Sequence, residues 1–430
     1  MIKYYSTNDR SLKVSFKEAI LSGLAKDKGL FMPEEFKKLN PEVYSQKNFS
    51  DMCYKVAQIM FDGEIPAQDL KMITDRVFIF DAPLRKLHDN IFVLELFHGP
   101  SAAFKDFAAR FMAEVMGYYV RKEKKKLTIL VATSGDTGSA VAKGFFLVPD
   151  IDVIILYPKG KVSILQEKQL TTLDENIISL EVKGTFDDCQ RMVKEAFVDN
   201  ELCSKVNLSS ANSINIARLL PQSFYYIWAY IQAKSPEVIF CTPSGNFGNL
   251  TAGLIAKKMG LAVKKFIAAT NVNDVVPEYL NTGIFNSRAS VQTYSNAMDV
   301  GNPSNFARMI DIYKDVESMK KDIIGFKATD KETIETIKEV YGKYDYILDP
   351  HSAVGYKAVK DFLSSNKTDD TPIILHGTAH PAKFPEIIKK AIGIEIDLPE
   401  VLAQAMHKKK HSIEIKANFK SLKEYLLNRS

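Results

Sequence analysis

Residues 96–111 read LFHGPSAAFKDFAARF, and the rest of the chain can be interpreted outward from this stretch. It begins as an irregular Gly-Pro segment and continues as an apolar-periodic helix from about residue 102. Lys105 stands at the junction, flanked by Phe104 and Phe107. Apolar surroundings lower the pKa of a lysine, so that its neutral amine can form a Schiff base with an aldehyde. The alternative is an ordinary amphipathic helix whose lysine extends to solvent, and this stretch alone leaves both open.

A second stretch, residues 241–253, reads CTPSGNFGNLTAG between an expected strand at 238–240 and an expected helix at 250–259. Glycines between a strand and a helix let backbone N–H groups point into one space, where a phosphate can bind. The stretch lacks the Gly-Lys-Ser/Thr ending of a P-loop and the Gly-x-Gly-x-x-Gly spacing of dinucleotide-binding loops. It therefore indicates a cradle for a small phosphorylated ligand. The residues assigned to this cradle are Ser244, Gly245, Asn246, Phe247, Gly248 and Asn249.

Three motifs then occur in order along the chain: HGPSAAFKD at 98–106, ATSGDTGSA at 132–140 and SGNFGN at 244–249. Each is weak alone, but together they resemble the threonine synthases over nearly the whole chain. Those are pyridoxal-phosphate enzymes of the tryptophan-synthase β-subunit group, or fold type II. The resemblance implies an α/β fold with two parallel-sheet lobes, flanking helices and a mainly helical N-terminal domain.

The resemblance also implies roles for particular residues. Lys105 would carry the pyridoxal phosphate and transfer protons. Thr378, after an expected strand at 373–376, would present a neutral hydroxyl to the pyridine nitrogen, although a threonine that merely ends a strand is the alternative. Asp136 would lie beside the phenolic oxygen of the cofactor. The neighbouring loop offers hydroxyls and N–H groups before a helix, which suits a substrate carboxylate. Its residues are Thr133, Ser134, Gly135 and Thr137.

The substrate implied by the resemblance is O-phospho-L-homoserine, which reacts with water to give L-threonine and phosphate. Such a substrate needs a second phosphate site, and residues 209–218 are polar and then helical. A structural ion pair is the alternative role for the arginine in this run, and Lys159 and Lys161 are further candidates. The residues assigned to the second phosphate are Ser210, Asn212, Asn215 and Arg218.

Two other functions stay open at this stage. One is a different fold type II enzyme, such as a serine/threonine dehydratase or a cysteine synthase, which needs no second phosphate site. The other is a catalytically silent domain that binds a phosphorylated ligand. Lys105 argues against a silent domain, and product analysis with phosphohomoserine, serine and threonine separates the enzymes.

Composition narrows the class of partner. The 430 residues include 57 basic and 52 acidic side chains, and a net charge of +5 is too dilute to indicate nucleic-acid binding. No apolar run is long enough to span a bilayer, and the start lacks a signal-peptide core. Four sparse cysteines favour a reducing cytoplasm. We expect a monomer or weak homodimer.

One pair of histidines has the spacing of a zinc helix. His376 and His380 are four residues apart, but Gly377 and Pro381 oppose a helix at this position. We therefore expect no metal.

The pattern along the chain predicts three parts. Residues 1–80 form a mainly helical domain, 81–397 the catalytic region with two α/β lobes, and 398–430 a tail with one helix at 422–427. Within the catalytic region, strands alternate with helices, which predicts parallel sheets with ligands beyond the carboxyl ends of the strands. The expected strands are 92–96, 127–132, 152–157, 177–180, 238–240, 265–269 and 373–376. We expect residues 271–305 to form surface loops around the site.

Overall fold

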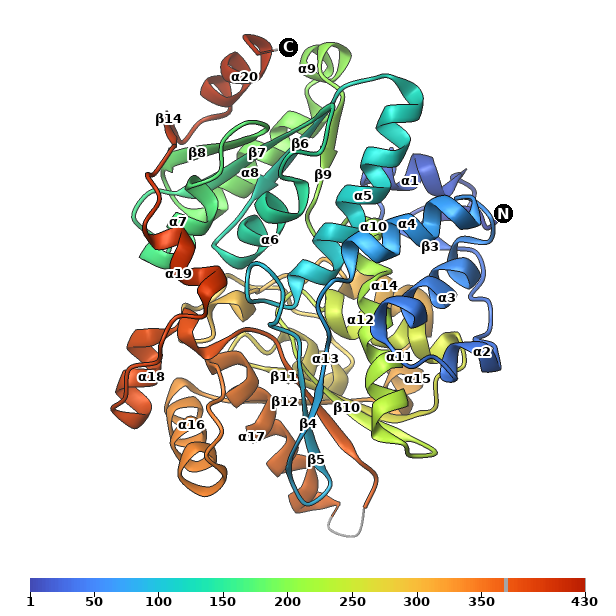
Figure 1. Ribbon diagram of the computed structural model, residues 1–430, viewed down its shortest axis with the longest axis vertical. Coiled ribbons are helices and arrows are strands. Elements are labelled where there is room, and N and C mark those ends of the chain that lie inside the picture. Colours follow the sequence, from blue (N-terminus) through green and yellow to red (C-terminus); the bar gives the residue numbers. More distant parts are fainter. Residues whose placement is uncertain (367–369, 430) are drawn as a thin grey trace. The chain divides into compact units, whose positions relative to one another are not determined.

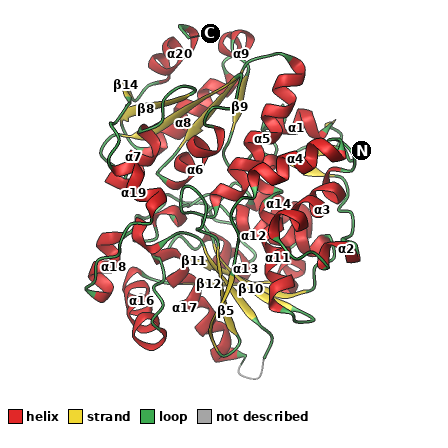
Figure 2. Ribbon diagram, viewed as in Figure 1, coloured by secondary structure: helices red, strands yellow, loops and turns green. Residues whose placement is uncertain are grey.

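The computed structural model describes residues 1–366 and 370–429 of the protein, and these residues fall into two compact units. The first unit comprises residues 1–2, 32–104 and 219–398, and the second comprises residues 3–31, 105–218 and 399–430. Each unit contains one large, mainly parallel β-sheet with helices packed against it (Figure 1 and Figure 2). The α/β fold class predicted from the sequence is confirmed.

The large sheet of the first unit has the strand order β12-β11-β10-β13-β5-β4. Its strands are β12 (Ile323–Lys327), β11 (Val263–Thr270), β10 (Val238–Pro243), β13 (Ile373–Gly377), β5 (Ile91–Glu95) and β4 (Leu84–His88). All neighbouring pairs from β12 to β5 are parallel, and only β4 runs antiparallel to its neighbour β5. The loops after β10, β13 and β5 therefore leave the same edge of the sheet, which is where open α/β sheets bind ligands.

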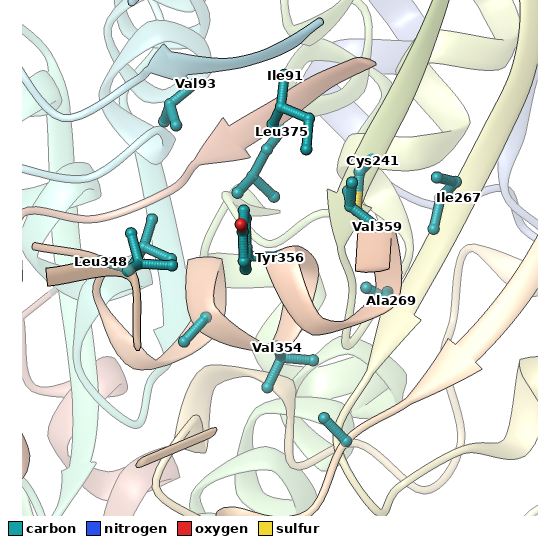
Figure 3. Packing of buried hydrophobic residues seen from close by; sticks show 14 of the residues in the cluster. Ile91, Val93, Cys241, Ile267, Ala269, Leu348, Val354, Tyr356, Val359 and Leu375 are labelled. Carbon is teal, nitrogen blue, oxygen red and sulfur yellow. The ribbon is translucent and has the colours of Figure 1, made fainter. Parts of the chain in front are cut away.

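The hydrophobic core of this unit lies between the sheet and three helices: α16 (Asp330–Tyr344), α17 (Pro350–Ser365) and α18 (Pro385–Ile392). Figure 3 shows Val359 of α17 beside Cys241 of β10, and Tyr356 of the same helix beside Leu375 of β13. Strand side chains alternate between faces. Accordingly Phe240, next to Cys241, packs on the other face against α11 (Gln222–Ala233), which has α12 (Gly248–Lys258) beside it.

The remaining helices of the first unit correct two expectations. They are α2 (Pro41–Tyr44), α3 (Phe49–Phe61), α4 (Ala67–Val77), α13 (Val275–Thr282), η1 (Asn296–Met298), α14 (Phe306–Tyr313), α15 (Val316–Asp322) and η2 (Pro381–Lys383). The sequence predicts Ser50 as the cap of a helix that runs through Met60, but α3 begins before Ser50, because Asn48 is its N-cap and accepts from the N–H of Asp51 at 2.9 Å. Residues 271–305 are not loops throughout, since they contain α13 and a network in which Asp299 accepts from Asn271 and Thr293.

The large sheet of the second unit has the order β14-β8-β7-β6-β9, and all its neighbouring pairs are parallel. Its strands are β14 (Ile413–Lys416), β8 (Ile177–Lys183), β7 (Ile151–Pro158), β6 (Leu127–Ala132) and β9 (Leu208–Ser210). Helices α8 (Phe186–Val198), α9 (Asn200–Lys205) and α20 (Phe419–Leu427) share one apolar cluster with this sheet. Helix α6 (Asp136–Phe145) packs between α5 (Lys105–Glu123) and α7 (Ile164–Thr171).

The ends of the chain add short elements. Strands β1 (Tyr4–Ser6), β2 (Lys13–Val14) and β3 (Phe31–Pro33) form a small sheet, and Ser15 caps α1 (Phe16–Ser22). Helix α10 (Ile216–Leu219) is a single turn.

The tail contains more than the one predicted helix: β14 extends the sheet beside β8, and α19 (Glu400–Met406) packs on α7. The sequence of β14 is short and mostly exposed, so it carries little strand signal. Both compact units draw on the predicted N-terminal segment, and the division of the sequence at residues 80 and 397 stays a prediction.

Candidate active site

The predicted cradle is a tight loop between a buried strand and a helix. Strand β10 ends at Pro243 and α12 begins at Gly248, after Phe247 with the left-handed φ of 58°. Thr251 is the first residue of α12 whose N–H reaches back into the helix, to the Phe247 carbonyl at 3.0 Å. The amides of residues 248–250 therefore have no acceptor within the helix and point, with the positive end of the helix dipole, towards the loop.

The wall of the cradle comes from residues 297–305. A Cβ atom on Gly245 would lie 2.7 Å from Met298 Cα and 2.8 Å from the Ala297 carbonyl, so only glycine permits this approach. Asn246 Oδ1 accepts from the N–H of Ser304 at 2.5 Å. The cradle is thus fixed from outside its own loop.

A neutral histidine backs the first turn of α12. His376 on β13 is fully buried, and burial lowers its pKa to about 3. Its Nδ1 accepts from the Asn249 amide at 3.3 Å, and Asn249 Oδ1 accepts from the Tyr225 hydroxyl at 2.8 Å. Because an amide N–H donates to Nδ1, we assign the ring proton to Nε2. An uncharged, hydrogen-bonded scaffold holds the helix terminus.

Ser244 and Thr378 lie at the ends of adjacent strands. The Ser244 hydroxyl is buried and donates to the Thr242 carbonyl at 3.0 Å, so phosphate binding through it requires an exchange of partner. Thr378 follows β13, the strand between β10 and β5. Its carbonyl accepts from the N–H of Phe104 at 2.9 Å, and the next residue, Lys105, begins α5.

The segment that leads to Lys105 is held at several points. Lys383 is buried, and its Nζ donates to the Ser101 carbonyl at 2.9 Å. The carbonyl of Ala102, whose φ is 54°, accepts from the N–H of His380 at 3.0 Å. The backbone before α5 is therefore fixed by residues 378–383, while the Lys105 side chain is half-buried.

Residues 133–137 of the second unit, a short loop and the first residues of α6, are held largely by their own hydrogen bonds. The Thr133 hydroxyl accepts from the N–H groups of Gly135 at 3.0 Å and Gly138 at 2.9 Å. Gln166 of α7 covers Gly135 and donates to Asp136 Oδ1 at 3.4 Å. Ser134 is exposed, and Thr137 is half-buried. Thr133 shapes the loop, whereas Ser134 presents a hydroxyl to solvent.

The residues proposed for the second phosphate also lie in the second unit. Arg218 is buried and donates from Nη1 to the Ala211 carbonyl at 2.8 Å. Asn215 donates to the carbonyls of Ile20 at 2.8 Å and Ser210 at 3.0 Å, so both of its amide hydrogens hold backbone. The Ser210 hydroxyl accepts from the N–H of Asn212 at 3.2 Å. Several polar groups of residues 210–218 are therefore already hydrogen-bonded to the backbone of their own unit.

The structure thus groups the predicted residues by unit. The cradle and Thr378 share the first, and the second contains Lys105, the loop at 133–137 and the run 210–218. Sequence reasoning missed Gln166, Lys383 and a cluster at the start of α17, in which Asp349 accepts hydrogen bonds from His351 and Ser352. Only the cluster had a local signal, an Asp-Pro pair that starts a helix. Within the described residues, no group of three or more metal-ligating side chains and no helix suited to crossing a membrane occurs.

Comparison with known proteins identifies the class. A family model for pyridoxal-phosphate dependent enzymes matches residues 78–376. The chain belongs to this family of fold type II enzymes, and pyridoxal phosphate is its cofactor.

Two further models, for the N terminus and the C-terminal part of threonine synthase, match residues 3–78 and 352–426. The threonine synthase of Haemophilus influenzae is 44% identical over 98% of this chain and 99% of its own length. The crystal structure of threonine synthase from Brucella melitensis with PLP bound is 36% identical, with a TM-score of 0.94 and full coverage of both chains. That of the Escherichia coli enzyme is 40% identical with a TM-score of 0.91, again over both full chains. The chain belongs to the threonine synthase family.

Proposed function

We propose that this enzyme converts O-phospho-L-homoserine and water to L-threonine and phosphate, with the residues predicted from the sequence in the roles given below. The observation that carries the residue assignment is the hydrogen bond from the Phe104 N–H to the Thr378 carbonyl. It ties the residue before Lys105 to the end of β13, the strand that neighbours the cradle strand β10 in the same sheet.

The residues present fit a pyridoxal phosphate group. The cradle brings backbone so close to residues 297–298 that a Cβ atom on Gly245 has no room, and the N-terminus of α12 directs amides towards it. Gly245, Asn246, Phe247, Gly248 and Asn249 would hold the phosphate, and Thr378 would meet the ring nitrogen. When bound, the cofactor withdraws electrons from the α carbon of an amino acid.

Lys105 is the proton carrier in this proposal. Its Nζ would take the proton of the substrate α carbon and, once that proton has been passed on, one proton of the β carbon. A proton goes to the γ carbon after phosphate leaves, and one returns to the α carbon after the oxygen of water has bonded to the β carbon and the spare proton of water has left. Thr378 contributes a hydroxyl without a charge, so it leaves the ring nitrogen unprotonated. Asp136, buried and held by Gln166, would face the phenolic oxygen.

The second unit would bind the rest of the substrate. Ser134, with the amides at the start of α6, would bind the carboxylate, and the Thr133 hydroxyl keeps those amides in place. Arg218, with Ser210 and Asn212, would neutralise the substrate phosphate.

Product analysis tests the function. Purified enzyme supplied with O-phospho-L-homoserine should release inorganic phosphate and L-threonine in equal amounts. Serine and threonine, supplied as controls, should give little or no keto acid. Keto acid from serine or threonine without phosphate release from phosphohomoserine would show a dehydratase instead.

We also propose a cytoplasmic location and a monomeric or weakly dimeric state. All four cysteines are free thiols in the structure, which suits a reducing compartment. Sedimentation at several concentrations measures the assembly.

A further inference from the structure

A buried cluster at the start of α17 is not used by the proposed chemistry. Asp349 is the N-cap of this helix, and it is buried together with His351 and Ser352. Asp349 Oδ1 accepts from His351 at two points, the backbone N–H at 2.9 Å and Nδ1 at 2.8 Å. Its Oδ2 accepts from the Ser352 hydroxyl. One carboxylate thus orients two side chains that leave it in different directions.

The first of these two side chains, the histidine arm (His351), contacts the wall of the cradle formed by residues 297–305. His351 Nε2 accepts from the N–H of Ala297 at 3.2 Å, so the ring is the neutral form with its proton on Nδ1. Ala297 and Met298 are the residues whose backbone lies against Gly245. The other end of the same wall is held by Asp299, which accepts from Asn271 and Thr293. His351 therefore holds in place the wall residue whose backbone lies against Gly245.

The serine arm reaches the residue assigned to the ring nitrogen. With its proton donated to Asp349, the Ser352 hydroxyl accepts from the N–H of Thr378 at 3.4 Å. Ser352 binds the N–H of Thr378 at the end of β13, while the carbonyl of Thr378 accepts from the N–H of Phe104. Ser352 thus sets the backbone position of Thr378.

We propose that Asp349, His351 and Ser352 are positioning residues that set the spacing between the phosphate cradle and the ring-nitrogen partner. The two ends of the cofactor are linked covalently, so a site for it must hold both contacts at one separation, and a single carboxylate shared by both arms does this. The inference rests on the proposed cofactor site and adds residues that touch neither cofactor nor substrate.

The roles of His351 and Ser352 can be tested separately by comparing two ligands, one with the phosphate group and one without it. Apoprotein is titrated with pyridoxal phosphate and with pyridoxal, which lacks the phosphate, and binding is followed by absorbance. His351→Asn removes the acceptor for Ala297, and should weaken pyridoxal phosphate about tenfold while pyridoxal binds as in the wild type. His351→Gln places an acceptor at the Nε2 position and should restore most of the loss.

The serine arm predicts a different signature. Ser352→Ala should shift the visible absorption of the bound cofactor and weaken both ligands by a similar factor of roughly three to ten. Asp349→Asn keeps the helix cap but loses the charge, so it should show both effects even if His351→Asn is insoluble. Asp315→Asn, at the N-cap of α15 with Ser318 as partner, is the matched control and should change neither ligand.

Two negative results have different meanings. If Asp349→Asn, His351→Asn and Ser352→Ala lower the melting temperature but bind both ligands as the wild type does, the cluster only caps α17 and the inference is wrong. If Gly245→Ala also leaves pyridoxal phosphate binding unchanged, the proposed cradle itself is wrong.

Discussion

Two loops of this protein look alike in sequence and are built differently. Residues 244–247 and 133–135 each follow a buried parallel strand and open a helix. The first loop is walled by distant segments, with Gly245 against Met298 and Asn246 bound to Ser304. The second is held mainly by its own Thr133 hydroxyl and covered by Gln166. The difference suits a resident cofactor in the first loop and an exchanging substrate in the second.

The largest expected effect comes from replacing Lys105, the proposed proton carrier. Lys105→Ala should lower turnover by about 10²–10⁴-fold, because the proton carrier is lost. Visible absorbance of the purified protein should disappear, and borohydride should attach the cofactor to Lys105 in the wild type only. Lys122→Ala, near the other end of α5, is the control and should retain both signals. A label on another lysine would exclude the assignment.

Arg218 tests whether the second unit binds the substrate phosphate. Loss of a charge-assisted hydrogen bond of roughly 1.5–3 kcal/mol should lower kcat/KM of Arg218→Ala about ten- to 150-fold. Inhibition by inorganic phosphate should weaken by a similar factor, and cofactor content should be unchanged. Loss of solubility with intact phosphate inhibition would make Arg218 structural, through its bond to the Ala211 carbonyl. Lys159 and Lys161 would then be tested next.

Gly245→Ala tests the rigidity of the cofactor loop. The added methyl group meets backbone atoms at 2.7–2.8 Å, and overpacking of this kind costs about 1–3 kcal/mol. The dissociation constant of pyridoxal phosphate should rise about five- to 150-fold in an absorbance titration. Gly342→Ala in α16 meets nothing within 4 Å, so it should bind the cofactor normally. Equal affinities in the two variants would remove the contrast between the loops.

His376 gives the cradle a pH dependence. In the unfolded chain a histidine has a pKa of about 6.5, whereas burial lowers that of His376 to about 3. Between these values the unfolded state binds one more proton, so stability is present above pH 6.5 and is lost as the pH falls. The loss from pH 7 to pH 5 should be about 2 kcal/mol smaller in His376→Gln, measured by urea unfolding. His407→Gln, at an exposed position, is the control and should lose as much stability between pH 7 and pH 5 as the wild type. The same loss in His376→Gln would contradict the prediction.

The smallest effects separate two neighbouring hydroxyls. Ser134→Ala should raise KM about two- to tenfold without a change in stability, since one neutral hydrogen bond to the substrate is lost. Thr133→Val should lower the free energy of unfolding by about 1–3 kcal/mol, because the N–H groups of Gly135 and Gly138 lose their acceptor. If Ser134→Ala instead lowers stability, the loop at 133–137 is as structural as the cradle.

Local pattern was sufficient for the elements next to the motifs. The strand before the cradle, the strand before Thr133 and the helix after Lys105 lie within a few residues of their predicted limits, because apolar runs and glycines are read over short distances. The pattern failed where contacts are distant. Strand β14 is exposed and exists through its pairing with β8, and the ordered part of residues 271–305 depends on Asp299 and its amide partners.

The sequence by itself determined the fold class and which motifs follow strands, since these depend on residue type and spacing, and the resemblance of its three motifs indicated the family and the cofactor. Tertiary structure decided which polar side chains are already occupied. The side chains of Asn215, Thr133 and Ser244 all form hydrogen bonds to backbone groups of the folded chain. Tertiary structure alone revealed what Asp349 does: its own partners, His351 and Ser352, are close to it in the chain, but they contact Ala297 and Thr378, which are distant. Hydrogen bonds require contact within about 3 Å, and only the folded chain brings Ala297 to His351.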